Sequence, residues 1–147
     1  MAQYQSDSFV GMSSLPTNSH GGMLMAHRCV VHFAVSTALA ANDLLVLGRL
    51  PAGYTVEEIK ADAAAAGLVL DVVAKPSLEG TDGDLALSSA VTLAAGEVAG
   101  PRTVAAINFE GSNTELFLVA KVTTGATMAA GSKVGVTFTY RYRQPTY

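Results

Sequence analysis

Apolar and polar residues alternate strictly over residues 133–143, near the end of the chain. One set of alternate positions holds branched and aromatic residues, namely Val134, Val136, Phe138, Tyr140 and Tyr142. The other set consists of glycine, threonine and arginine. A period of two is typical of a half-buried strand, because successive side chains of a strand point to opposite faces of its sheet. The segment therefore predicts a strand with one apolar and one polar face.

The same alternation recurs earlier in the chain. Residues 23–36 carry apolar residues at both sets of positions, as in a central strand. Shorter strands are predicted at 43–50, 68–74, 85–93 and 114–122, with turns or loops at 38–42, 51–53, 76–84, 94–101 and 110–113. Residues 102–109 lie between the last two of these turns. The loop 123–132 then leads into 133–143, so we expect the last two strands to form a hairpin with a long connection.

Residues 54–66 allow two interpretations. Their alanines suit a short helix with Glu57 and Glu58 in its first turn, where the helix dipole favours acidic side chains. The same residues also fit the end of a strand around Val56 and Ile59, followed by a loop. We favour the strand, because the next predicted strand follows too soon for a long crossover helix.

Seven or eight short strands with regular turns predict an all-β fold. We expect a single antiparallel β-sandwich, jelly-roll-like, in residues 23–147. Residues 1–22 are polar, with glycine, serine and Pro16, and predict a flexible, extended N-terminal arm. Such an arm cannot bury enough apolar surface by itself. We therefore expect it either to be disordered or to become ordered by lying on another chain.

The composition favours an assembly component over a free monomer. Charged residues make up 14% of the 147 residues, against about 25% in ordinary soluble domains. The net charge of −3 argues against a nucleic-acid partner, whose phosphates would need many cations. No segment approaches the ~20 apolar residues of a membrane span, and residues 1–10 lack the pattern of a signal peptide. The lone Cys29 cannot form an internal disulfide, so a reducing compartment, the cytosol, is expected.

The residue patterns predict neither an enzyme nor a cofactor. The chain has no Gly-x-Ser-x-Gly motif, and residues 125–133 lack the spacing of a phosphate loop. His27 and His32 fall on opposite faces of one predicted strand. His27 and Cys29 share a face, but they supply two ligands where a zinc site needs three or four. We therefore predict no catalytic residue, no cofactor and no metal site.

An acidic cluster lies in the loop 76–84. Glu79, Asp82 and Asp84 carry the oxygen ligands that Ca²⁺ prefers, but the spacing of a twelve-residue calcium loop is missing. We interpret them as solvated charges. Asp62 and Asp71 would act as an acid–base pair only if their strands met, and the spacing does not predict such a meeting.

Six residues suit a protein–protein interface: Arg102, Tyr140, Arg141, Tyr142, Arg143 and Tyr147. An arginine fork binds carboxylates or backbone carbonyls across an interface, and tyrosine supplies amphipathic contact area. The alternative is an exposed rim on an edge strand. We predict an interface around these residues.

Three stretches of the chain carry a resemblance to a known family. They are residues 42–53 (NDLLVLGRLPAG), the strand 68–73, and the ending 134–142 (VGVTFTYRY). Across residues 27–143 the chain resembles small virion proteins of tailed bacteriophages, in particular head decoration (cement) proteins. The resemblance implies a non-enzymatic β protein that is made in the bacterial host cytoplasm and located in the virion, on the outer capsid surface. Its expected partners are the major capsid protein and further copies of itself, most simply as a homotrimer at local three-fold axes.

Two other classes of protein remain open. A tail or head–tail accessory protein would share this composition and fold. A carbohydrate- or receptor-binding β-sandwich is the third class, although such proteins usually display exposed aromatic residues and this chain has no Trp. No nucleic-acid or membrane partner is expected.

Overall fold

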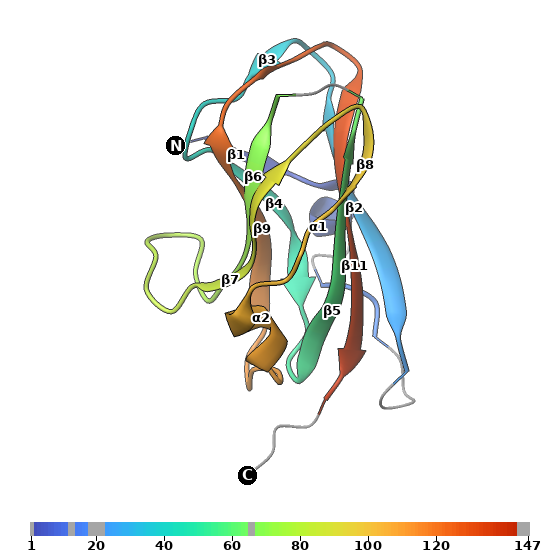
Figure 1. The fold of residues 1–147 in the computed structure, drawn as a ribbon, viewed down its shortest axis with the longest axis vertical. Helices are drawn as coiled ribbons and strands as arrows, with labels where there is room; N and C mark the ends of the chain where they lie inside the picture. Colours follow the sequence, from blue (N-terminus) through green and yellow to red (C-terminus); the bar gives the residue numbers. More distant parts are fainter. Residues whose placement is uncertain (1, 12–13, 18–22, 65–66, 144–147) are drawn as a thin grey trace.

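The computed structural model describes residues 2–11, 14–17, 23–64 and 67–143. They form two sheets that face each other across one hydrophobic core (Figure 1). The five-stranded sheet has the order β1 (Gln3–Gln5), β4 (Leu44–Leu50), β9 (Leu116–Thr124), β6 (Val69–Lys75) and β7 (Leu85–Thr92). The four-stranded sheet has the order β2 (Met25–Phe33), β11 (Ser132–Tyr142), β5 (Tyr54–Ala63) and β8 (Gly96–Ala99). A small sheet pairs β3 (Thr37–Ala38) with β10 (Thr127–Met128).

The main strands pair from the two ends of the chain inward. β2 pairs with β11, β4 with β9, β5 with β8, and β6 with β7, all antiparallel. These pairs alternate between the two sheets, which is the winding of a jelly roll. The predicted all-β, antiparallel and jelly-roll-like sandwich is therefore confirmed.

The predicted hairpin between the last two strands is wrong. β9 lies in the five-stranded sheet between β4 and β6, whereas β11 lies in the four-stranded sheet between β2 and β5. The connection between them crosses from one sheet to the other. Alternation along a strand predicts which face is buried, but it carries no information about which strand is the neighbour. Proximity along the chain was therefore a poor guide to pairing.

The ambiguous residues 54–66 contain a strand, as favoured, and this strand, β5, is longer than expected. The register between β5 and β11 shifts at one point, where Glu57 is an extra residue in β5. Such a β-bulge changes which face the following residues occupy. Val56 and Ile59 are three positions apart, yet both are buried in the core. A spacing of three also suits a helix, which explains the ambiguity of the sequence.

One segment differs from its predicted conformation, and a second segment had no predicted conformation. The turn predicted at 94–101 contains the edge strand β8, whose residues pair with Lys60, Ala61 and Asp62 of β5. Because β8 shows no apolar alternation, its pairing depends on the backbone of β5. Residues 102–109 contain the short helix α2 (Val104–Asn108). The Thr103 side chain caps this helix by accepting a hydrogen bond from the Ala106 amide, at 3.1 Å.

The described part of the predicted arm lies on its own domain. β1 pairs in parallel with the edge of β4, and α1 (Asp7–Gly11) follows. Leu15 is 2% exposed and belongs to the core, and the Tyr140 hydroxyl donates to the Pro16 carbonyl oxygen at 2.6 Å. In these described residues the segment therefore packs on the sandwich of its own chain. The predicted boundary at residue 22 falls outside the described residues.

Candidate interaction surfaces

The described residues of the predicted interface lie at the end of β11 and just before α2, at one end of the sandwich (lower end of Figure 1). We call this region the β11 end and define it by Arg102, Val104, Ile107, Tyr142 and Arg143. The chain segments here are joined by backbone hydrogen bonds. The Gly53 amide donates to the Ser112 carbonyl oxygen at 2.8 Å, and the Arg143 amide donates to the Gly53 carbonyl oxygen at 2.7 Å. The residues after α2 and the end of β11 are therefore held together.

The three predicted interface arginines all pair within the chain. Arg141 Nε donates to Glu57 Oε1 at 2.8 Å, and an Arg102 nitrogen lies 3.8 Å from the other oxygen of the same carboxylate. Arg143 lies 3.7 Å from a Glu110 oxygen. The bulge in β5 is what presents Glu57 to two arginines at once. Their side chains are partly exposed, so a partner would meet arginines that are already oriented by carboxylates.

The predicted interface tyrosines separate into different environments. Tyr140 is fully buried, and its ring lies 5.8 Å from the Tyr54 ring. Burial raises the pKa of Tyr140 to about 12. Its side chain therefore packs in the core and does not face a partner, contrary to the prediction. Tyr142 is 40% exposed and packs edge-on against Tyr54 at 5.5 Å. Tyr147 lies outside the described residues.

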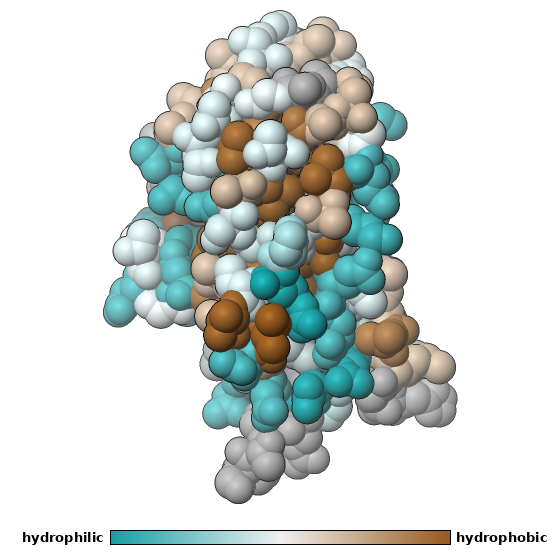
Figure 2. Space-filling view, viewed as in Figure 1, coloured by the Kyte–Doolittle hydropathy of each residue, from teal (hydrophilic) through white to brown (hydrophobic). Residues whose placement is uncertain are grey.

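Sequence reasoning missed the exposed apolar residues of α2. Ala106 is buried beneath the helix, whereas Val104 and Ile107 are 74% and 56% exposed. Residues three apart share a face of a helix, so these two side chains form one apolar surface. Figure 2 shows apolar side chains gathered over α2, beside strongly hydrophilic ones. The only signal in the sequence was two branched residues in a short segment, which normally indicates core.

The outer face of the four-stranded sheet is polar and internally paired. The Arg28 guanidinium on β2 pairs with the Asp62 carboxylate on β5 across Gly135 of β11. A Cβ atom at Gly135 would lie 2.7 Å from Arg28 Nε, so the absence of a side chain leaves room for this ion pair. Lys60 lies 3.2 Å from a Glu58 oxygen. Arg28, Asp62, Lys60 and Glu58 on this face therefore pair with one another.

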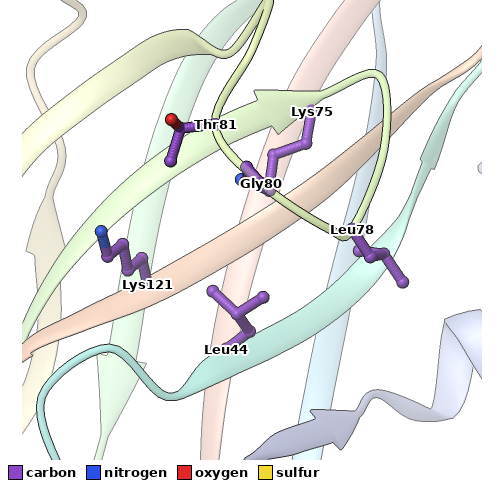
Figure 3. A pocket seen from close by; sticks show the side chains of 6 residues that line it. All are labelled: Leu44, Lys75, Leu78, Gly80, Thr81 and Lys121. Atoms are coloured by element: carbon purple, nitrogen blue, oxygen red, sulfur yellow. Dashed lines mark hydrogen bonds between the residues drawn. The ribbon is translucent and has the colours of Figure 1, made fainter. Parts of the chain in front are cut away.

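The loop between β6 and β7 folds over the outer face of the five-stranded sheet. Lys75 is buried, and its ammonium donates to the Gly80 carbonyl oxygen at 2.9 Å and to Asp84 at 2.5 Å. Beneath the loop is a pocket of about 180 Å³ (Figure 3). The loop contributes Leu78, Gly80 and Thr81 to this pocket, and the strands contribute Leu44, Lys75 and Lys121.

The acidic cluster of this loop does not gather around a site. Asp84 turns toward the Lys75 ammonium. Within the described ranges, no three His, Cys, Asp or Glu side chains lie close enough together to hold a metal ion. None of the helices in the described part of the chain is both long and apolar enough to span a membrane.

A Ser–His–Asp cluster joins α1 to β2, but its geometry is not that of a nucleophilic site. Ser8 Oγ lies 2.7 Å from His27 Nε2. Asp7 accepts hydrogen bonds from the backbone amides of Ser8 and Val30, at 2.7 and 3.2 Å. A catalytic triad needs the carboxylate on the second ring nitrogen of the histidine. The cluster instead fastens the first turn of α1 to β2.

The pKa shifts of Asp7 and of the neighbouring Cys29 are consistent with a structural role for this cluster. Burial opposes ionisation of Asp7, but the hydrogen bonds from the Val30 and Ser8 amides outweigh it and lower the Asp7 pKa. Burial raises the pKa of the neighbouring Cys29 thiol to about 12. A thiol with such a pKa is un-ionised at neutral pH and is a poor nucleophile.

The fold has a counterpart among solved structures. A chain from the capsid of Ralstonia phage GP4 superposes with a TM-score of 0.73 and 24% sequence identity, over 99% of this chain and 100% of that chain. The two chains therefore share one fold from end to end. No protein-family model matches the sequence, and no curated protein matches it significantly.

Proposed function

We propose that this protein is a structural component of a tailed-bacteriophage virion. In this proposal it binds the outside of the capsid as a homo-oligomer and stabilises the contacts between neighbouring major capsid subunits. The observation that carries the proposal is the similarity to a chain of the GP4 capsid, which covers both chains almost completely. The resemblance of residues 27–143 to head decoration proteins points the same way.

The surface at the β11 end supports a role in assembly. Val104 and Ile107 are exposed apolar residues, and Tyr142 lies at the same end of the sandwich. Arg102 and Arg143 add oriented, partly exposed guanidinium groups. Apolar and aromatic residues next to arginine are enriched at protein–protein interfaces. We assign this surface to contacts between copies of the chain, most simply in a trimer.

The proposed mechanism is mechanical. Packaged DNA pushes the capsid subunits apart, and an oligomer that spans a seam adds contacts that must also break. Several weak contacts act together when they are held in one oligomer, so a small protein gains avidity from symmetry. The long antiparallel pairings of β11 with β2 and β5 suit this role, because they give the domain a stiff sheet to carry the load.

Binding to capsids is the direct test of this function. The purified protein would be mixed with expanded phage heads that lack it, and the mixture sedimented at increasing protein concentration. We expect saturable recovery with the heads, and electron microscopy should place added density on the outer capsid surface. Recovery in the supernatant at every concentration would contradict the proposal. Density confined to the tail or to the head–tail junction would reassign the protein to another part of the virion.

The oligomeric state needs a separate measurement. Light scattering of the purified protein, at 15.1 kDa per chain, distinguishes a monomer from a trimer. We expect the mass of a trimer. A monomer in solution that occupies three-fold positions on the head would mean that the oligomer forms on the capsid.

A further inference from the structure

Arg49 differs from most cations of this protein in having no carboxylate partner among the described residues. The basic residues that pair with carboxylates are Arg28, Lys60, Lys75, Arg102, Arg141 and Arg143. Arg49 Nε is also buried without a hydrogen-bond partner in the described part of the chain. Burying a guanidinium nitrogen without a partner costs free energy. A charge kept in this state is a candidate for pairing in a complex.

Two aromatic rings hold the Arg49 guanidinium in place. Its central carbon lies 5.1 Å from the centre of the Phe117 ring and 5.9 Å from the centre of the Phe9 ring. The two ring centres lie 6.3 Å apart, so the cation and the two rings form one compact cluster. Stacking on aromatic faces orients an arginine before it meets a ligand, and less side-chain entropy is then lost on binding.

The position of Arg49 in the fold is also fixed. It lies on β4 opposite Phe117 of β9, on the outer face of the five-stranded sheet. Its carbonyl oxygen accepts a hydrogen bond from the Leu15 amide at 2.9 Å, which ties it to the N-terminal segment. Phe9 belongs to α1, and the next residue, Val10, is 70% exposed. One cation is therefore set among aromatic and apolar side chains.

The surroundings of Arg49 favour a protein carboxylate over a nucleic-acid phosphate. Binding to nucleic acid depends on several cations that neutralise successive phosphates. Of the two lysines on this face, Lys75 is already paired with Asp84, so Lys121 is the one further cation on this face without a carboxylate partner in the described part of the chain. An arginine between aromatic residues is instead the composition of a protein–protein hot spot, and its fork matches a carboxylate with two hydrogen bonds.

We propose that Arg49 anchors an aspartate or glutamate of a partner protein, so that the outer face of the five-stranded sheet beside α1 is a docking surface. The proposal rests on the proposed function, which makes the partner the major capsid protein. It assigns two different surfaces to two kinds of contact. The sheet face around Arg49 meets the capsid, and the β11 end meets other copies of the chain.

The first experiment compares two variants that each remove one positive charge. Arg49→Met keeps an apolar stem beside the rings, and Lys133→Met removes a charge from the exposed side of β11 in the other sheet. Affinity for heads that lack the protein would be measured by sedimentation. We expect Arg49→Met to bind roughly 30-fold more weakly or worse, as for the loss of one partner of a desolvated charge pair. Lys133→Met should bind as the wild type does.

A second variant tests the chemistry of the contact and does not depend on a loss of binding. Arg49→Lys keeps the charge and places an amine where a zero-length carbodiimide reagent joins it to a carboxylate as an amide. After coupling on heads, mass spectrometry should find residue 49 linked to an aspartate or glutamate of the capsid protein. Circular dichroism and thermal unfolding would establish that each variant is folded.

Each outcome decides between the two proposals. If the wild type binds heads and Arg49→Met binds equally well, or if bound Arg49→Lys gives no crosslink at residue 49, the assignment of Arg49 is wrong and the proposed function stands. If the wild type does not bind heads, the proposed function and the capsid partner both fall. If the wild type binds a short DNA duplex and Arg49→Met does not, the partner group of Arg49 is a nucleic-acid phosphate and the proposed carboxylate is wrong.

Discussion

At the scale of single residues, burial separates side chains that look equivalent in the sequence. Tyr140 and Tyr142 are two positions apart on β11 and point to the same side of the strand. Tyr140 lies in the core, whereas Tyr142 is at the end of the strand and is 40% exposed. The bulge in β5 and the nearby N-terminal segment enclose the first tyrosine. The same residue type therefore stabilises the fold at one position and is free for contacts at the next.

Replacing Tyr140 by phenylalanine should cost stability. The variant loses the hydrogen bond from the hydroxyl to the Pro16 carbonyl oxygen, and we expect the free energy of unfolding to fall by about 1 kcal/mol. Tyr142→Phe is the matched control and should change it by less than about 0.5 kcal/mol. Urea unfolding measures both. Equal effects of the two substitutions would mean that the buried hydroxyl adds nothing.

At the scale of elements, the N-terminal segment behaves as part of the sandwich. β1 extends the five-stranded sheet, and α1 contacts both β2 and β4 at the open side between the two sheets. The N-terminal segment both donates hydrogen bonds to the rest of the sandwich and accepts them from it. The Ala2 amide donates to Asp43, and the Val30 amide donates to Asp7. Predictions at this scale therefore concern how this segment is attached.

Leu15→Ala should be strongly destabilising. The side chain is 2% exposed and belongs to the core, and a buried leucine replaced by alanine typically costs about 2–5 kcal/mol. Val10→Ala, at a position that is 70% exposed, is the control and should cost less than about 0.5 kcal/mol. The midpoint of chemical unfolding reports both values. If Leu15→Ala left it unchanged, the segment would be a separate arm after all.

The attachment of the N-terminal segment should weaken in acid. Hydrogen bonds from the Ala40 and Ala2 amides lower the pKa of Asp43 below 3.8. A lowered pKa contributes stability above about pH 3.8, and this contribution is lost as the pH falls through the pKa of the folded state. Asp43→Asn cannot titrate. Its deficit in urea stability relative to the wild type should therefore be largest near neutral pH and shrink below pH 4.

The control for this pH effect is Asp82→Asn, in the exposed loop 76–84. Its difference from the wild type should stay small across the same range. A deficit of Asp43→Asn that is constant from pH 7 to pH 3 would mean that ionisation of Asp43 contributes nothing to stability.

At the scale of the whole molecule, the surface is divided into regions of different character. The outer face of the four-stranded sheet carries paired charges, and the β11 end carries exposed apolar residues. The face around Arg49 carries a cation that packs beside two rings and has no carboxylate partner among the described residues. An oligomer that clamps a capsid needs two kinds of contact, one with itself and one with the shell. The division of the surface supplies a candidate for each.

The double variant Val104→Ser and Ile107→Ser should weaken the oligomer without unfolding the chain. Both side chains are exposed, so their replacement costs the monomer little, whereas loss of buried apolar area at an interface should raise the dissociation constant roughly tenfold or more. Light scattering across a dilution series measures this change. Val35→Ser, which is 69% exposed in a turn, is the control. If the molar mass of the double variant matched that of the wild type at every dilution, α2 would not be part of the interface.

The sequence by itself determined the class of fold and the buried faces of the strands. Alternation is a local property, and burial of Val134, Val136 and Phe138 follows from it directly. It also identified most of the strands. These predictions needed only the geometry of one strand at a time.

The tertiary structure decided what depends on residues far apart in the chain. The pairing of β9 and β11 with separate partners, the bulge at Glu57, and the docking of Leu15 into the core all arise from contacts across the sandwich. The sequence of residues 1–22 looks polar on average, yet Leu15 in the core, together with hydrogen bonds of Asp7 and Ser8 to β2, attaches the described part to the sandwich. Arg49 likewise had no distinguishing pattern. Ion pairs form between charges that are close in space and not along the chain. Only the fold therefore decides that no carboxylate among the described residues reaches Arg49.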